Sequence, residues 1–469
     1  MKRTLNEETI KYIDKEVKVV GWVNSVRAHG KIIFIDLRDW SGLLQLVFLP
    51  KNEEAYKNVK NVRSEWVIEA TGKISKRPSR MANPKITTGG VELLVSGLKV
   101  LSRAKNLPFA IDGDGYDINE EKRMRFRYLD LRRERMKRNL IVRQKVIQFM
   151  RNFLQGEGFI EVETPIITKS TPEGARDFII PSRLQQGKFY ALPQSPQQYK
   201  QLLQVAGVEK YFQIARCFRD EDPRADRQAE FTQLDIEMSF IEQRDILDLI
   251  ERLYISLVKK LFPEKKIQKI PFPRLSYKEV IEKYKSDKPD LRKDKNNPNE
   301  LAFAFVVDFP MFEWKEEEKR WDAVHHPFTR PQSEDIKFIK KNPGKILAFQ
   351  YDFVLNGYEI GGGSLRSYKP EILEAVFEVM GHKRDEIWDK FGHLLKSFEY
   401  GVPPHGGIAP GIDRFLAILL DEPSIREVIA FPKTGDNRDL MMGAPSEVSG
   451  EQLKELGIKL DVKKKEKKK

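Results

Sequence analysis

Apolar and polar residues alternate in five short stretches of the first hundred residues, a pattern typical of β-strands with one buried face. The stretches are 17–23, 31–38, 43–49, 66–74 and 91–100. A polar segment at 52–63, between the third and fourth stretches, predicts a short helix. Five strands with a helix after the third indicate an OB-type barrel, a common oligonucleotide platform, although the pattern also fits another small barrel.

The spacing of apolar residues along the chain changes after residue 138. Apolar residues recur there at helical spacing until two glycines end the pattern; they are Val142, Val146, Phe149, Met150 and Phe153, followed by Gly156 and Gly158. Strands and helices then follow without a regular βαβ rhythm, so we expect an α+β domain. We divide the chain into a barrel (1–102), an arginine-dense linker (103–138), a second domain (139–462) and a lysine-rich tail (463–469), which we expect to be disordered.

Composition narrows the class of protein. The 469 residues include 83 Lys and Arg against 70 Asp and Glu, a net charge of +13, of which the tail KKKEKKK supplies five. The remaining surplus fits a polyanionic partner and fits an ordinary solvated surface equally well. The single cysteine, Cys217, excludes an internal disulfide framework. Neither a long apolar run nor an apolar leader is present, so we expect a soluble cytoplasmic protein.

Candidate chemistry begins at a predicted hairpin, where an arginine-rich turn at 216–227 precedes a strand at 230–237. Alternation places Gln233, Asp235 and Glu237 on one face of that strand. Such a polar face suits a polar pocket, and the alternative is a solvated hairpin. The sequence contains no GxxxxGK[ST] motif, so a nucleotide would need a binding mode other than a P-loop.

Two further segments combine glycines with charge. Three consecutive glycines, 361–363, lie between Glu359 and Arg366, where we expect a close approach of the backbone or a flexible turn. Arg414 follows Gly411 at the start of a predicted helix, where the helix dipole disfavours a cation, so an anionic ligand is the better partner. The adjacent pair His325 and His326 lacks spaced metal partners, which favours ligand contact from a loop.

Taken together, these segments resemble the class II aminoacyl-tRNA synthetases, and specifically the bacterial-type aspartyl-tRNA synthetases. The residues that carry the resemblance are GFIEVETPIIT (158–168), TPEGARDF (171–178), ALPQSPQQYKQLL (191–203), FRDEDPRADRQAEFTQLD (218–235), HHPFT (325–329), NGYEIGGGSLR (356–366) and GIAPGIDR (407–414). Each segment is a weak match by itself, but their shared order over nearly the whole chain is specific.

The resemblance implies an antiparallel-sheet catalytic domain that activates L-aspartate with ATP and transfers it to tRNA-Asp, as a homodimer formed through the first class motif around Pro165. Arg219, Glu221 and Arg414 are the implied catalytic residues. The implied aspartate contacts are Glu173, Ser195, Gln197, Lys200, Arg219, Asp235, His325 and Arg366. The implied ATP contacts are Arg219, Asp220, Glu221, Gln228, Phe231, Glu359, Gly411, Ile412, Asp413 and Arg414, and Asp352 and Glu359 match the family's Mg²⁺ ligands.

Amino-acid choice follows from charge within this resemblance. Lys200 and Arg366 occupy the positions of the family's two cations for the substrate carboxylate, with Asp235 balancing them. An asparagine enzyme would gain nothing from a lysine at position 200, because an amide leaves that charge unpaired.

The first domain resembles the family's anticodon-binding OB domain. This implies that Phe34 stacks on an anticodon base and that Arg27, Gln45 and Glu92 contact base edges. The alternative for Phe34 is an ordinary barrel-core residue. His29 stands where members specific for tRNA-Asp often have leucine, and histidine there is associated with enzymes that also charge tRNA-Asn.

The sequence departs from the family in one large feature. Bacterial-type members carry an extra domain between the second and third class motifs, whereas here the short segment 286–310 connects the two regions almost directly. Three other readings remain. An asparaginyl-tRNA synthetase is disfavoured by Lys200. A paralogue that forms an amide without using tRNA is disfavoured by the intact barrel. A protein that only binds RNA is disfavoured because Arg219, Glu221, Glu359 and Arg414 are all present.

Overall fold

The computed structural model describes residues 1–170, 175–222 and 224–461. The chain divides into two compact units, 1–110 and 111–469. The catalytic part of the resemblance lies in the second unit. The predicted tail at 463–469 and Glu173 fall outside the described residues.

Unit 1 is a closed five-stranded barrel in the order β1-β2-β3-β5-β4. Its elements are η1 (Glu7–Lys11), β1 (Glu16–His29), β2 (Ile32–Arg38), β3 (Leu43–Phe48), α1 (Glu53–Val59), β4 (Val67–Lys76), η2 (Ser79–Met81) and β5 (Val91–Ser102). The helix lies between the third and fourth strands, so the OB-type expectation is confirmed. The first strand is longer than predicted, because β1 continues past Val23 to pair with β2 as far as His29.

Unit 2 is built on an eight-stranded sheet in the order β12-β14-β17-β18-β19-β10-β9-β6. The strands are β6 (Ile160–Glu161), β9 (Lys210–Phe218), β10 (Glu230–Ser239), β12 (Arg274–Ser276), β14 (Phe303–Val307), β17 (Gln350–Leu355), β18 (Tyr358–Leu365) and β19 (His405–Pro410). All neighbours are antiparallel except the two outer pairs, β12–β14 and β6–β9. The antiparallel α+β fold is therefore confirmed.

Small strand pairs and helices complete the unit. The pairs are β7 (Ile179–Pro181) with β8 (Phe189–Ala191), β11 (Lys266–Ile267) with β13 (Glu300–Leu301), and β15 (Phe312–Lys315) with β16 (Arg320–Ala323). The helices are α2 (Glu120–Arg125), α3 (Arg127–Asp130), α4 (Glu134–Gly156), α5 (Gln197–Val205), α6 (Gln243–Leu261), α7 (Tyr277–Tyr284), α8 (Ile336–Lys341), η3 (Pro343–Lys345), α9 (Pro370–Val379), α10 (Arg384–Phe398), α11 (Ile412–Leu419), η4 (Ile425–Glu427) and α12 (Gly450–Glu455).

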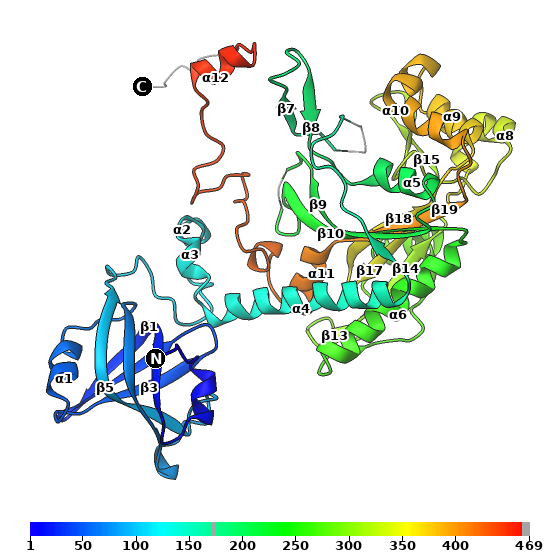
Figure 1. Ribbon diagram of the computed structural model, residues 1–469. Helices are drawn as coiled ribbons and strands as arrows, with labels where there is room; N and C mark the ends of the chain where they lie inside the picture. The colour runs from blue at the N-terminus through cyan, green and yellow to red at the C-terminus, as the bar shows by residue number, and fades with distance from the viewer. Residues whose placement is uncertain (171–174, 223, 462–469) are drawn as a thin grey trace. The chain divides into compact units, whose positions relative to one another are not determined.

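The helices α4 and α6 lie along one face of this sheet (Figure 1). The helical spacing predicted after residue 138 explains the packing, because Val146 and Met150 are fully buried against it. Tyr254 of α6 packs edge-on against Phe353 and Phe415, which come from β17 and α11. The apolar face of the sheet is thus occupied by helices, which leaves its polar face for a site.

Several arginines of the segment predicted as an arginine-dense linker (103–138) are buried in unit 2. Asp130 pairs with Arg123, Arg127 and Arg133, whose side chains are at most 6% exposed. Arg123 also pairs with Glu427 of η4 at 2.9 Å. These charges are balanced inside the protein, so they do not contribute to a surface for a polyanion.

No helix in the described part of the chain has the length and apolarity needed to cross a membrane.

Candidate active site

A cavity of about 360 Å³ opens on the polar face of the sheet in unit 2. It is formed by β10, β18 and β19 together with α5, α11 and the loops that hold Arg227 and His325. Most of the residues implied by the resemblance line it: Ser195, Gln197, Lys200, Arg219, Glu221, Gln228, Phe231, Asp235, His325, Glu359, Arg366, Gly411, Asp413 and Arg414. Asp220, Ile412 and Asp352 are not part of the lining, and Ile412 belongs to the hydrophobic core.

Lys200 and Arg366 meet two carboxylates at the closed end of the cavity. Nζ of Lys200 donates to Oδ1 of Asp235 at 2.7 Å and lies 3.2 Å from Oε2 of Glu237. Arg366 holds Glu237 through Nε at 2.8 Å and Nη2 at 3.0 Å. All four side chains are nearly inaccessible to solvent, so the solvated-hairpin alternative for β10 is excluded.

Glu237 was on the predicted polar face of β10, but its role as the partner of Arg366 was not foreseen. Burial alone would raise the pKa of Glu237, yet Arg366 and Lys200 hold it at about 2. Burial raises the pKa of Asp235, against the opposing effect of Lys200. The backbone makes room for this pair at Gly407, where a Cβ would lie 2.2 Å from Oε2 of Glu237.

Three buried N–H groups on the cavity lining have no partner among the described residues: Nε of Arg219, Nε2 of His326 and Nε of Arg414. Nδ1 of His326 accepts the backbone N–H of Phe328 at 3.2 Å, which places the ring proton on Nε2. Burial, with Arg366 and Lys200, lowers the pKa of His326 well below its ordinary value, so the ring is neutral. Buried donors of this kind are normally satisfied, which indicates an acceptor-rich ligand.

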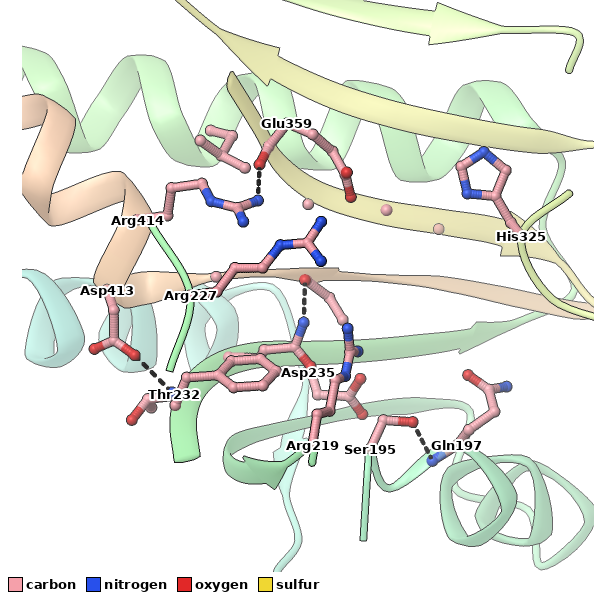
Figure 2. Close-up of a pocket in the computed structure, with 18 of the residues that line it drawn as sticks. Ser195, Gln197, Arg219, Arg227, Thr232, Asp235, His325, Glu359, Asp413 and Arg414 are labelled. Carbon is pink, nitrogen blue, oxygen red and sulfur yellow. Dashed lines mark hydrogen bonds between the residues drawn. The ribbon is translucent and has the colours of Figure 1, made fainter. Parts of the chain in front are cut away.

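The other end of the cavity gathers arginines. Arg219 lies over the ring of Phe231, 5.1 Å from its centroid. Arg227, which was not among the predicted site residues, lies between Arg414 and Arg219 (Figure 2) and is 3.2 Å from Glu221. Arg414 donates to the backbone carbonyl of Glu359 and lies 3.2 Å from Oδ2 of Asp226. The concentration of guanidinium groups suits a polyphosphate.

Asp352 and Glu359 face the same glycine. A Cβ on Gly362 would lie 3.3 Å from Oδ1 of Asp352 and 3.5 Å from Oε1 of Glu359. Burial, and then the charge of Glu359, raise the pKa of Asp352 well above its ordinary value. The described residues hold no cluster of three or more His, Cys, Asp or Glu that could bind a metal alone. Two carboxylates fit Mg²⁺, which is commonly held by one or two carboxylates plus substrate phosphates.

The five residues implied in anticodon binding lie on one outer face of the barrel in unit 1. Arg27, His29 and Phe34 follow the alternation of β1 and β2, and Gln45 and Glu92 continue the face on β3 and β5. Phe34 is half-buried and is absent from the barrel core, which is filled instead by Ile35 and Leu37. The core alternative for Phe34 is therefore excluded.

Two charged residues on this face were missed. Asp36 accepts from Nη2 of Arg27 at 2.8 Å and from Oγ of Ser25 at 2.7 Å. Arg77, at the end of β4, lies 3.6 Å from Glu92, which itself accepts from Gln45 at 2.9 Å. Burial lowers the pKa of Arg77. The alternation of β2 placed Asp36 beside Phe34, so that signal was available in the sequence.

Comparisons with known proteins agree with these two units. Residues 119–435 match the family described as tRNA synthetases class II (D, K and N), and residues 17–101 match the OB-fold nucleic acid binding domain of the anticodon-binding family. An aspartate–tRNA(Asp/Asn) ligase from Dehalococcoides mccartyi (strain CBDB1) is 41% identical over 586 aligned positions, covering 96% of this chain and 98% of the relative. One from Dictyoglomus turgidum is 44% identical, covering 98% of each.

Solved structures show the same fold. An asparaginyl-tRNA synthetase from Pyrococcus horikoshii has a TM-score of 0.75 at 23% identity, covering 92% of this chain and 98% of that one. An aspartyl-tRNA synthetase from Entamoeba histolytica has a TM-score of 0.72 at 23% identity, covering 92% and 91%. The barrel, the antiparallel sheet with its cavity, and the full-length relatives lead to one assignment: the chain belongs to the class II tRNA synthetases of the D, K and N group.

Proposed function

We propose that this protein is an aspartate–tRNA ligase, which activates L-aspartate with ATP and transfers it to the 3′ end of tRNA-Asp and tRNA-Asn. The observation that carries the proposal is the buried Lys200 on the cavity lining, 2.7 Å from Asp235. The ammonium of Lys200 and the unpartnered Nε2–H of His326 are donors that suit a side-chain carboxylate, and the cluster of Arg219, Arg227 and Arg414 suits a polyphosphate. A tRNA-charging enzyme works where tRNA is used, which places this protein in the cytoplasm.

The first chemical step joins the α-carboxylate of aspartate to the α-phosphorus of ATP. The new C–O–P linkage forms as the bond to pyrophosphate breaks, and negative charge develops on the phosphoryl oxygens. Arg219, on the cavity lining, is the candidate to stabilise that charge, and its unpartnered Nε is a donor available for it. Phe231, which lies against Arg219, offers a flat apolar surface for the adenine ring.

The second step transfers the aspartyl group to a ribose hydroxyl of the terminal adenosine, and AMP leaves. Little covalent chemistry is required of the protein, so positioning and electrostatic stabilisation supply the rate. Mg²⁺, when bound, would neutralise phosphate charge, and Asp352 and Glu359 are the residues that would hold it.

Aspartate is favoured over asparagine by the donors at the closed end. Lys200 has three N–H donors, of which Asp235 and Glu237 engage two. We propose that the remaining donor of Lys200 and the unpartnered Nε2–H of His326, two residues of the cavity lining, face the substrate side chain and require an acceptor. A carboxylate offers acceptors only, whereas the NH₂ group of an amide would meet another donor.

Recognition of tRNA is assigned to the outer face of the barrel that carries Arg27, Phe34 and Gln45. His29 lies at the exposed end of β1 on the same face, in line with the relatives that are named for both tRNA-Asp and tRNA-Asn. We therefore propose relaxed tRNA choice, with His29 as one of its determinants.

A homodimer through the first class motif is part of the proposal. Ile160, Ile166 and Ile167 are each about half exposed (57%, 49% and 53%), and β6 forms an outer strand of the sheet. Apolar side chains beside an open sheet edge favour association. Analytical ultracentrifugation of the intact protein tests this, with a monomer at micromolar concentration as the contradicting result.

The extra domain of bacterial-type members is proposed to be absent between β12 and β14. In this chain α7, a loop and β13 make that connection. The alignment with the Dehalococcoides mccartyi relative spans 586 positions, more than the 469 residues of this chain. This difference supports the proposal that the relative contains segments that this chain lacks.

Two assays test the proposed function. ATP–pyrophosphate exchange with aspartate, asparagine and lysine should proceed with aspartate only; exchange with asparagine or lysine instead would overturn the assignment. Aminoacylation of purified tRNA-Asp and tRNA-Asn should give aspartyl-tRNA with both. No charging of tRNA-Asn would restrict the protein to tRNA-Asp.

A further inference from the structure

Arg143 of α4 joins the first turn of α11 to the beginning of β10, directly beside the candidate active site. Nη1 of Arg143 donates to Oδ1 of Asp413, and Nη2 donates to Oγ1 of Thr232 at 2.9 Å. Oδ2 of Asp413 accepts the backbone N–H of Thr232 at 2.8 Å. We call Arg143, Asp413 and Thr232 the Arg143 junction.

The junction engages both carboxylate oxygens of Asp413, whose side chain is only 4% exposed. The resemblance implied that Asp413 contacts ATP, but its hydrogen bonds point toward β10 and α4. Figure 2 shows the two neighbouring side chains leaving α11 in different directions, Asp413 toward Thr232 and Arg414 toward Glu359. Asp413 therefore acts on the site through the position of its helix.

Arg414 needs such a support. The helix α11 spans eight residues, and its N-cap, Gly411, provides no side-chain hydrogen bond. A cation in the first turn is opposed by the helix dipole, so the helix itself does not favour the orientation of Arg414. Because consecutive residues of a helix have fixed relative directions, anchoring Asp413 against β10 sets the direction in which Arg414 leaves the helix.

We propose that Arg143 is a positioning residue for Arg414: it holds Asp413 against Thr232 and so directs the Arg414 guanidinium into the polyphosphate end of the cavity. The inference rests on the proposed function, since it takes ATP as the ligand of Arg414. Without Arg143, the buried carboxylate of Asp413 would lose its charge partner and turn toward solvent, and α11 would turn with it.

Steady-state ATP–pyrophosphate exchange with aspartate tests this role. We expect Arg143→Met to raise the KM for ATP at least tenfold and to leave the KM for aspartate within twofold. Arg143→Lys, which keeps the charge but cannot bond Asp413 and Thr232 together, should give an intermediate KM for ATP. Arg320→Met is the matched control, because Arg320 of β16 also pairs with a carboxylate, that of Glu318 at 2.6 Å, and is not part of the cavity lining.

A double-mutant cycle separates positioning from general stabilisation. In an Arg414→Ala background, Arg143→Met should change kcat/KM for ATP by less than twofold, because the group through which it acts is gone. Full multiplication of the two single effects would overturn the proposal, and so would kinetics of Arg143→Met that match those of Arg320→Met. If Arg143→Met does not fold, an unchanged KM for ATP in Arg143→Lys overturns it equally. Absence of aspartate-dependent exchange in the wild type would instead contradict the proposed function.

Discussion

Arg366 and Glu237 form a bidentate ion pair at the closed end of the cavity, with N–O distances of 2.8 and 3.0 Å and both side chains nearly inaccessible to solvent. The guanidinium is thereby fixed in one plane, with Nη1 donating to Ser364 at 2.7 Å. A preorganised cation of this kind loses little conformational entropy when it binds a carboxylate.

Glu237→Gln should destabilise the protein by about 3–5 kcal/mol, because Arg366 would remain buried without its counter-charge. Urea unfolding measures this free energy. Glu334→Gln is the control: it breaks the partly exposed pair with Lys369, for which the expected cost is at most about 1 kcal/mol. Equal effects of the two substitutions would contradict the importance of burial.

Lys200→Met should abolish aspartate-dependent ATP–pyrophosphate exchange, since the side-chain carboxylate would lose its ammonium partner. The KM for ATP should change little where residual exchange is measurable, because Lys200 contacts Asp235 and Glu237 and none of the arginines proposed to bind ATP. Thermal unfolding of the same preparation controls for misfolding. Exchange at a rate near that of the wild type would refute the role of Lys200.

The pH dependence of stability should contain a contribution from Glu427. Burial alone would raise the pKa of Glu427, but Arg123, Arg127 and Arg135 lower it from 4.5 to about 2. Because the folded pKa is depressed, the contribution is complete above pH 4.5 and is lost as the pH falls toward 2, about 3 kcal/mol in all. Denaturant unfolding should show that the free energy of unfolding falls less between pH 6 and pH 2.5 in Glu427→Gln than in the wild type. An equal fall in the two proteins would contradict the assignment to Glu427.

Phe34→Leu should raise the KM for tRNA in aminoacylation and leave ATP–pyrophosphate exchange unchanged. Stacking on a base contributes about 1–3 kcal/mol, which corresponds to roughly 5- to 150-fold in affinity. Trp40→Leu is a matched control, because Trp40 is an exposed aromatic residue of the same unit outside the proposed face. An equal loss in both variants would argue against base stacking by Phe34.

Local pattern was sufficient for much of the fold. Alternation located the strands of the barrel because one face of each strand is buried, and the spacing of Val146 and Met150 located α4 because one side of that helix packs on the sheet. The same alternation put Gln233, Asp235 and Glu237 on one face. The glycines at 361–363 left a close backbone approach and a flexible turn open. They lie in β18, where a Cβ on Gly363 would be 2.3 Å from the carbonyl oxygen of Gly407, so the close approach is confirmed.

The sequence by itself determined the element types, the family resemblance and the identity of most residues that line the cavity, because these depend on residue type and local spacing. Only the tertiary structure decided which charges are neutralised internally. The partners Arg123 and Glu427, Arg143 and Asp413, and Arg366 and Glu237 are each more than a hundred residues apart. Pairing over such separations depends on how strands and helices pack, so the order of charges along the chain did not indicate that arginines of 123–133 are buried in ion pairs, and it left Arg143 unnoticed.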